Sequence, residues 1–124
     1  MWVVAALYNL GFAAFHLTFW RLLGWRRQLP RLSRDTGGVL QISTLCLTLV
    51  LLFFAYILTV HPRELSTTPL GRDVLGGVTA FWLARTVEQT VFMDLRRRFH
   101  RVLLLVFALG TALHAALLKL WALG

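Results

Sequence analysis

Residues 74–93 carry the sequence VLGGVTAFWLARTVEQTVFM, a segment long enough to cross a bilayer but interrupted by two charged side chains, Arg85 and Glu88. A bilayer core about 30 Å thick needs about 20 residues of α-helix. An arginine at the centre of such a helix costs on the order of 2.5–3.5 kcal/mol on insertion scales, so charged residues at this depth face a bundle interior and find partners there. The segment therefore predicts a bundle of membrane helices with a polar interior, and Arg85 and Glu88 are its first candidate site residues.

The composition of the whole chain also favours a lipid environment. Its 124 residues are 58% hydrophobic with a mean hydropathy of +0.70, whereas soluble domains are about 45–50% apolar. The net charge of +8 is concentrated in two short arginine-rich segments between apolar stretches, which is typical of membrane topology and not of nucleic-acid binding. The single cysteine, Cys46, excludes an intrachain disulfide. We expect one integral membrane domain over residues 1–124 and no nucleic-acid partner.

Four segments are apolar enough to be membrane spans, approximately residues 1–20, 38–60, 72–94 and 101–122. The first lacks the basic start and small-residue cleavage site of a signal peptide, so we expect it to be retained. With four spans the two arginine-rich connections lie on the same face, as the positive-inside rule requires. We therefore predict an all-α, up-down-up-down four-helix transmembrane bundle with both termini outside. Both Arg-rich loops are then cytoplasmic, and we expect a bacterial inner membrane.

Proline and capping residues predict the helix boundaries. The His61-Pro62 pair ends the second span, because the residue before proline is disfavoured in the α region. The Thr68-Pro69 pair supplies an N-cap and a proline at the first helical position, so the third helix is expected to begin near Pro69. The second helix is expected to begin at Gly37, after a stretch of chain-breaking residues.

Each predicted span also carries polar groups at a depth where only other protein groups can satisfy them. Because one helical turn takes about 3.6 residues, Trp82, Arg85 and Gln89 share one face of the third helix, with Glu88 beside Arg85 at i+3. A bundle with a polar interior seam satisfies these groups. The candidate ligand-binding or proton-handling residues of this seam are Asn9, His16, Gln41, Trp82, Arg85, Glu88, Gln89 and His114.

The Arg85–Glu88 pair has two interpretations. One is that it only fixes helix packing, but a buried ion pair rarely adds stability over apolar residues of similar volume. The other, which we favour, is a role in binding an anionic group, carrying protons or gating. Glu88 and His16 lie at similar depth in the predicted bundle, so we expect them to meet near its axis and to titrate as a coupled pair.

The histidines do not have the arrangement of a metal or haem site. Haem held by two histidines needs them at similar depth on facing helices. His16 and His114 are offset along the membrane normal by roughly 12–14 Å, counting ~1.5 Å per residue. The chain also lacks the HxxxH or ExxH pairs that facing helices use for zinc or di-iron. We predict no metal and no cofactor, with b-type haem kept as a weaker alternative.

Three functions stay open at this point. The first is a small membrane protein whose polar seam binds or passes a small polar or amphiphilic ligand, such as a lipid, a quinone or a proton-coupled solute. The second is an accessory or assembly subunit of a larger membrane complex. The third, which the sequence favours least, is a membrane-embedded enzyme or b-type haem protein that uses His16, His100 or His114. The expected partners are membrane lipids and either further copies of the chain or a larger complex.

Overall fold

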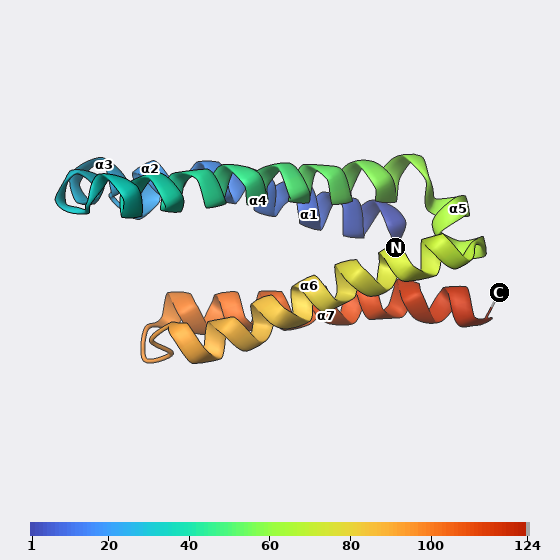
Figure 1. The fold of residues 1–124 in the computed structure, drawn as a ribbon. Coiled ribbons are helices and arrows are strands. Elements are labelled where there is room, and N and C mark those ends of the chain that lie inside the picture. Colours follow the sequence, from blue (N-terminus) through green and yellow to red (C-terminus); the bar gives the residue numbers. More distant parts are fainter. Residues whose placement is uncertain (124) are drawn as a thin grey trace. The chain divides into compact units, whose positions relative to one another are not determined.

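The computed structural model describes residues 1–123, and every regular element within them is a helix (Figure 1). Two compact units are present: Met1–Ala5 with Leu58–Gly124, and Ala6–Ile57. The elements in chain order are α1 (Trp2–Leu17), α2 (Phe19–Leu22), α3 (Trp25–Gln28), the 3-10 helix η1 (Leu29–Arg31), α4 (Arg34–Val60), α5 (Pro62–Thr67), α6 (Pro69–Phe92) and α7 (Arg98–Leu123).

The chain reverses direction between α1 and α4 through a short basic segment that contains α2, α3 and η1 (Figure 1). Gly24 makes the turn between α2 and α3 with a φ of 66°, a left-handed conformation that favours glycine. Ser33 precedes α4, and its hydroxyl accepts a hydrogen bond from the Thr36 N–H at 3.1 Å, as an N-cap residue does. This cap lets α4 begin at Arg34, ahead of the start predicted at Gly37.

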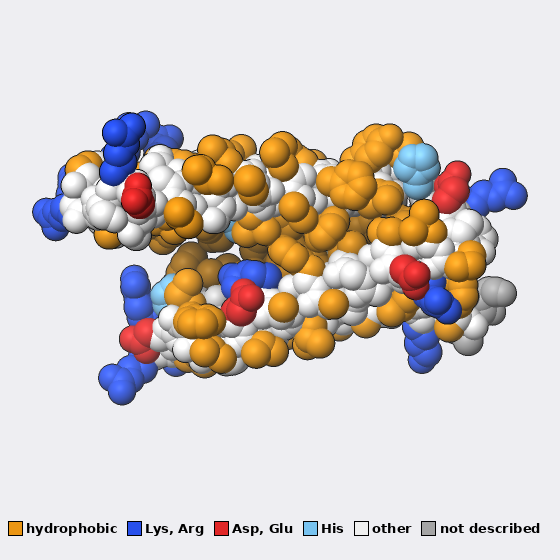
Figure 2. Space-filling model, in the orientation of Figure 1, with side chains coloured by type: hydrophobic (Ala, Val, Ile, Leu, Met, Phe, Trp, Pro, Cys, Tyr) orange, Lys and Arg blue, Asp and Glu red, His pale blue; other side chains and the backbone are white. Residues whose placement is uncertain are grey.

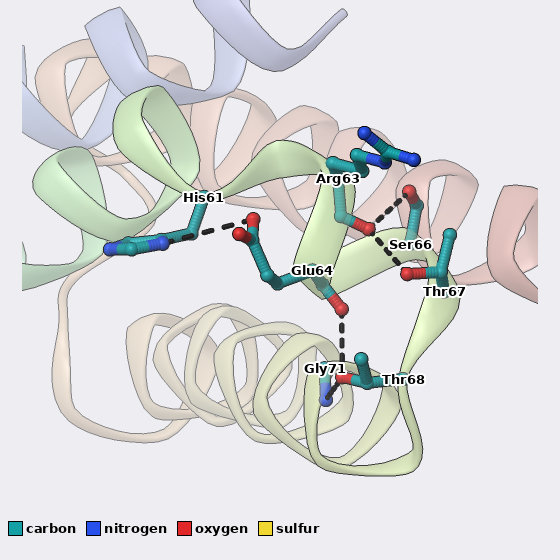
Figure 3. A network of polar contacts seen from close by, with 7 residues as sticks. All are labelled: His61, Arg63, Glu64, Ser66, Thr67, Thr68 and Gly71. Atoms are coloured by element: carbon teal, nitrogen blue, oxygen red, sulfur yellow. Dashed lines mark hydrogen bonds and ion pairs between the residues drawn. The ribbon is translucent and has the colours of Figure 1, made fainter.

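The connection between α4 and α6 is itself helical, which the sequence did not indicate. The helix α4 ends at Val60 and Pro62 begins α5, so the boundary predicted at His61-Pro62 is confirmed. The hydroxyls of Ser66 and Thr67 both donate to the Arg63 carbonyl, at 3.0 and 2.8 Å, within α5 (Figure 3). The corner between α4 and α6 is therefore an ordered helical turn.

The helix α6 begins at Pro69, as the Thr68-Pro69 pair predicted. The Thr68 hydroxyl accepts from the Gly71 N–H at 2.9 Å and donates to the Glu64 carbonyl at 2.8 Å, which ties α6 to α5 (Figure 3). A Cβ added at Gly71 would overlap the backbone of Glu64 and Leu65. The close approach of α5 and α6 at this corner therefore requires glycine at position 71.

The helices α6 and α7 form an antiparallel hairpin joined by residues 93–97 (Figure 1). Buried residues recur along both helices in steps of three and four, the seven-residue pattern with which two helices interlock side chains along a seam. On α6 they are Gly71, Leu75, Val78, Trp82 and Gln89. On α7 the buried set is Phe107, Gly110, His114 and Leu117. Arg85 occupies the remaining position of the α6 series, between Trp82 and Gln89.

Within residues 1–123, two helices are long and apolar enough to cross a bilayer: Arg34–Val60 and Arg98–Ala122. The helix α1 is apolar but shorter, and α6, with Arg85 and Glu88 in its second half, does not meet the same criterion. Large apolar side chains are exposed on the long helices, including Leu49 at 66% and Leu109 at 60%, and hydrophobic side chains cover much of the face in Figure 2. The all-helical class is confirmed, and membrane association is weakly indicated; the predicted four-span bundle goes beyond this finding.

Candidate functional site in the α6–α7 hairpin

Arg85 and Glu88 form an ion pair on α6, in the contact that their i, i+3 spacing predicted. The Arg85 Nη1 donates to Glu88 Oε2 at 3.0 Å, and the two side chains are 26% and 49% exposed. The guanidinium carbon also lies 4.7 Å from the centroid of the Phe107 ring on α7. A cation over an aromatic face is attracted by the ring quadrupole. Arg85 is therefore held by a carboxylate on its own helix and by a ring on the facing helix, and about a quarter of its side chain stays exposed.

A stack of rings continues from Phe107 into the hairpin interior. The Trp82 ring lies 6.0 Å from Phe107, at an interplanar angle of 27°, and 6.3 Å from His114, at 22°. All three side chains are at most 3% exposed. The Nδ1–H of His114 donates to the Gly110 carbonyl at 2.6 Å, so the proton on this nitrogen is assigned by its acceptor. Phe107, Trp82 and His114 thus form a stack that carries the Arg85 guanidinium at one end.

Gln89 links α6 to the start of α7 and leaves a buried oxygen without a partner. Its Nε2 donates to the His100 carbonyl at 3.1 Å. This contact fixes the amide orientation, because the flipped amide would place two oxygens together. Gln89 is 1% exposed, and its Oε1, together with Nδ1 of His100, has no hydrogen-bond partner in the described part of the chain. A buried polar atom left unpaired costs about 1–3 kcal/mol. Because both atoms are buried, only a group that enters the interior of the hairpin can pair with them.

One more polar contact crosses the hairpin. The hydroxyls of Thr86 on α6 and Thr111 on α7 lie 3.2 Å apart, and each also lies within hydrogen-bonding distance of a backbone carbonyl of its own helix, at 2.8 and 2.9 Å. Because a hydroxyl has one proton, one of the two donates across the hairpin while the other donates to its own carbonyl. The sequence did not single out Thr86. Its position next to Arg85, on the side of α6 that faces α7, could have indicated Thr86. Phe107 shares a face of α7 with Thr111 and His114 by helical spacing, but its contact with Arg85 depends on the register between the two helices.

The other predicted seam residues lie in the unit Ala6–Ile57. Asn9 and His16 are buried, at 0% and 8% exposed, and His16 Nδ1–H donates to the Phe12 carbonyl at 2.6 Å. Gln41 accepts from the Trp20 indole N–H at 3.2 Å and donates to the Gly37 carbonyl at 3.2 Å. 

His16 and Glu88 therefore belong to different units. Glu88 has Arg85 as an ion-pair partner, and the coupled His16–Glu88 pair stays a prediction. Among residues 1–123 no three His, Cys, Asp or Glu side chains are grouped as metal ligands.

No protein-family model, no curated protein and no solved structure matches this chain. The functional interpretation therefore rests on the geometry of the α6–α7 hairpin, in particular on Arg85, Glu88, Gln89 and His100.

Proposed function

We propose that this chain is a four-span membrane protein whose α6–α7 hairpin binds a small polar or amphiphilic ligand through Arg85. The observation that carries the proposal is the group of accessible or unpartnered polar atoms on one short stretch of α6 and the start of α7. It combines the partly exposed Arg85–Glu88 ion pair with the unpaired buried oxygen of Gln89 and the unpaired buried Nδ1 of His100.

The charges on α6 support this interpretation over simple packing. Leu83, Val87 and Val91 on the same helix are more than half exposed, so Arg85 and Glu88 lie among apolar surface suited to lipid. Ionisable groups at this depth are costly and typically mark ligand or ion pathways. The guanidinium is planar and can hold a carboxylate or phosphate with two hydrogen bonds. An anionic or strongly polar ligand group would therefore bind at Arg85, with Gln89 Oε1 as acceptor for a donor on the ligand.

The four-span arrangement places this site inside a membrane bundle. With four spans, both arginine-rich connections lie on the cytoplasmic side and both termini lie outside. The helix α6 then crosses the bilayer in spite of its charges, because those charges have partners in the hairpin.

Organic extracts of the purified protein test the proposal. Mass spectrometry of extracts from wild type, Arg85→Gln and Arg72→Gln should show a compound that co-purifies with wild type and Arg72→Gln but is lost from Arg85→Gln. Arg72 is the matched control, because it forms an ion pair with Asp73 on the same helix at 3.3 Å but lies at the helix start. Gel filtration and circular dichroism establish that each variant is folded. Identical extracts from all three proteins would contradict a ligand site at Arg85.

A second candidate function is an accessory subunit, and the surface of α7 favours it. Ala108 and Ala112 are exposed, one turn apart, on a helix that is long and apolar enough to span a bilayer. Small residues at this spacing let two membrane helices approach closely. Blue native electrophoresis of gently solubilised membranes separates the two functions. A complex much larger than this chain that is lost in Ala108→Leu, with the Arg85-dependent compound absent, would favour the subunit role.

A further inference from the structure

The turn between α2 and α3 forms an open, basic surface pocket of about 580 Å³, lined by residues of the segment 20–27. Three of the lining residues are Arg21, Arg26 and Arg27, and none of the lining residues is acidic. All three arginines are exposed, and none of them has an ion-pair partner within residues 1–123. The pocket therefore concentrates positive charge that no carboxylate of the described chain neutralises.

The pocket is built on an ordered base. The left-handed Gly24 turns the chain between α2 and α3, and Arg21 and Arg26 on either side of it both line the pocket. Beneath the turn, the Trp25 side chain is 7% exposed and its ring lies 5.5 Å from Phe19 and 5.1 Å from Trp20, in edge-on contacts.

Two hydrogen bonds fix this segment further. The Trp20 indole N–H donates to Gln41 Oε1 on α4 at 3.2 Å, and Gln28 Nε2 donates to the Leu23 carbonyl at 3.1 Å. The backbone that presents the arginines is therefore held by aromatic packing and by contacts at both ends of the turn.

The charged and apolar side chains that line the pocket are suited to a phosphate group that carries an apolar tail. Arginine binds phosphate with two parallel hydrogen bonds, and a cluster of arginines without carboxylates favours a dianion or phosphodiester. Leu22 and Leu23, at 51% and 39% exposed, adjoin the charges with apolar surface. Tryptophan, as at position 20, is enriched at the level of lipid headgroups. A free phosphate would use the arginines and leave this apolar surface without a partner.

We propose that the pocket formed by residues 20–27 binds the phosphate of an anionic phospholipid headgroup, with Arg21, Arg26 and Arg27 as its ligands. This site is separate from the one at Arg85 and rests on the proposed insertion of the chain in a membrane. Its occupant would anchor the connection between α1 and α4 at the bilayer surface.

Native mass spectrometry of the protein in neutral detergent tests the site by titration with phosphatidylglycerol or phosphatidylcholine. Wild type should bind phosphatidylglycerol in preference to phosphatidylcholine. Charge-assisted hydrogen bonds from arginine to a phosphate are each worth roughly tenfold in affinity or more, so the triple variant Arg21→Gln, Arg26→Gln, Arg27→Gln should lose at least on the order of a hundredfold. The matched control is Arg96→Gln, Arg97→Gln, Arg98→Gln, which removes the same charge from the other basic connection.

The control variant should retain phosphatidylglycerol affinity within about twofold, because the pocket is intact. Equal losses of affinity in both triple variants would show general electrostatic attraction and would overturn the site. No loss of affinity in either variant would also overturn it. In a separate arm, millimolar inorganic phosphate should fail to displace the lipid, since it lacks the apolar tail. Complete displacement would overturn a lipid occupant in favour of a free anion. The Arg85-dependent compound should be unchanged in the pocket variant, which separates failure of this site from failure of the proposed function.

Discussion

Replacing Trp82 with alanine removes the central ring of the stack in the α6–α7 hairpin. Trp82 has stacked partners on both sides, Phe107 and His114, and each aromatic pair contributes about 0.5–1.5 kcal/mol beyond its burial. Losing both contacts therefore costs about 1–3 kcal/mol. The side chain is also 1% exposed, and large-to-alanine changes of buried aromatic residues cost about 3–5 kcal/mol in total because a cavity remains. We expect Trp82→Ala to lower the free energy of unfolding by about 3 kcal/mol.

Unfolding of the purified protein by SDS in mixed micelles, followed by circular dichroism, measures this change. The matched control is Phe92→Ala, an aromatic residue of the same helix that is 79% exposed and should change stability by less than about 0.5 kcal/mol. A double-mutant cycle with Phe107→Ala should give a coupling energy of about 0.5–1.5 kcal/mol. Equal stability of the Trp82 and Phe92 variants, or zero coupling, would refute the stack as a structural element of the hairpin.

Three smaller changes test other contacts of the same hairpin by the same titration. Gly71→Ala should destabilise by about 1–3 kcal/mol, because the new methyl group meets the α5 backbone; an unchanged protein would contradict the close α5–α6 corner. Trp121→Phe should cost about 1 kcal/mol through loss of the 2.9 Å hydrogen bond from the indole to the Thr68 carbonyl, and a neutral result would argue against that contact. Thr111→Val should cost only about 0.6 kcal/mol, the average for hydrogen bonds between membrane helices, since the Thr86 hydroxyl keeps its backbone acceptor. A loss several times larger would show that the threonine pair is a main determinant of the hairpin.

The sequence predicted the features that depend on local geometry. The end of α4 before Pro62 and the start of α6 at Pro69 follow from what proline does to its own residue and its neighbour, whatever the rest of the fold. The shared face of Trp82, Arg85 and Gln89 follows from helical periodicity, and two of the three are fully buried in the hairpin. The Arg85–Glu88 contact needs only an i, i+3 spacing.

Features that depend on contacts between residues far apart in the chain could not be predicted from the sequence. The position of Arg85 over Phe107 is set by the register between α6 and α7, which residues 93–97 determine and no periodicity predicts. The helical structure of α5 was not predicted from the sequence, which indicated only the boundaries on either side of it. The Ser66 and Thr67 hydroxyls donate to a backbone carbonyl within the turn. The pocket at Gly24 likewise requires Trp25 to pack under the turn, which a run of arginines and leucines does not indicate.

The membrane topology of the two arginine-rich segments tests the central claim most directly. In a Cys46→Ser background, single variants Arg31→Cys and Arg97→Cys place one thiol in each basic connection, and both positions are exposed. Arg63→Cys in α5 is the control for the opposite face.

Labelling with a membrane-impermeant maleimide in right-side-out and inverted vesicles reports the side of each thiol. The four-span arrangement predicts that Arg31→Cys and Arg97→Cys react only from the cytoplasmic side and that Arg63→Cys reacts only from the other side. Labelling of positions 31 and 97 from opposite sides would show that α6 does not cross the membrane and would contradict the account.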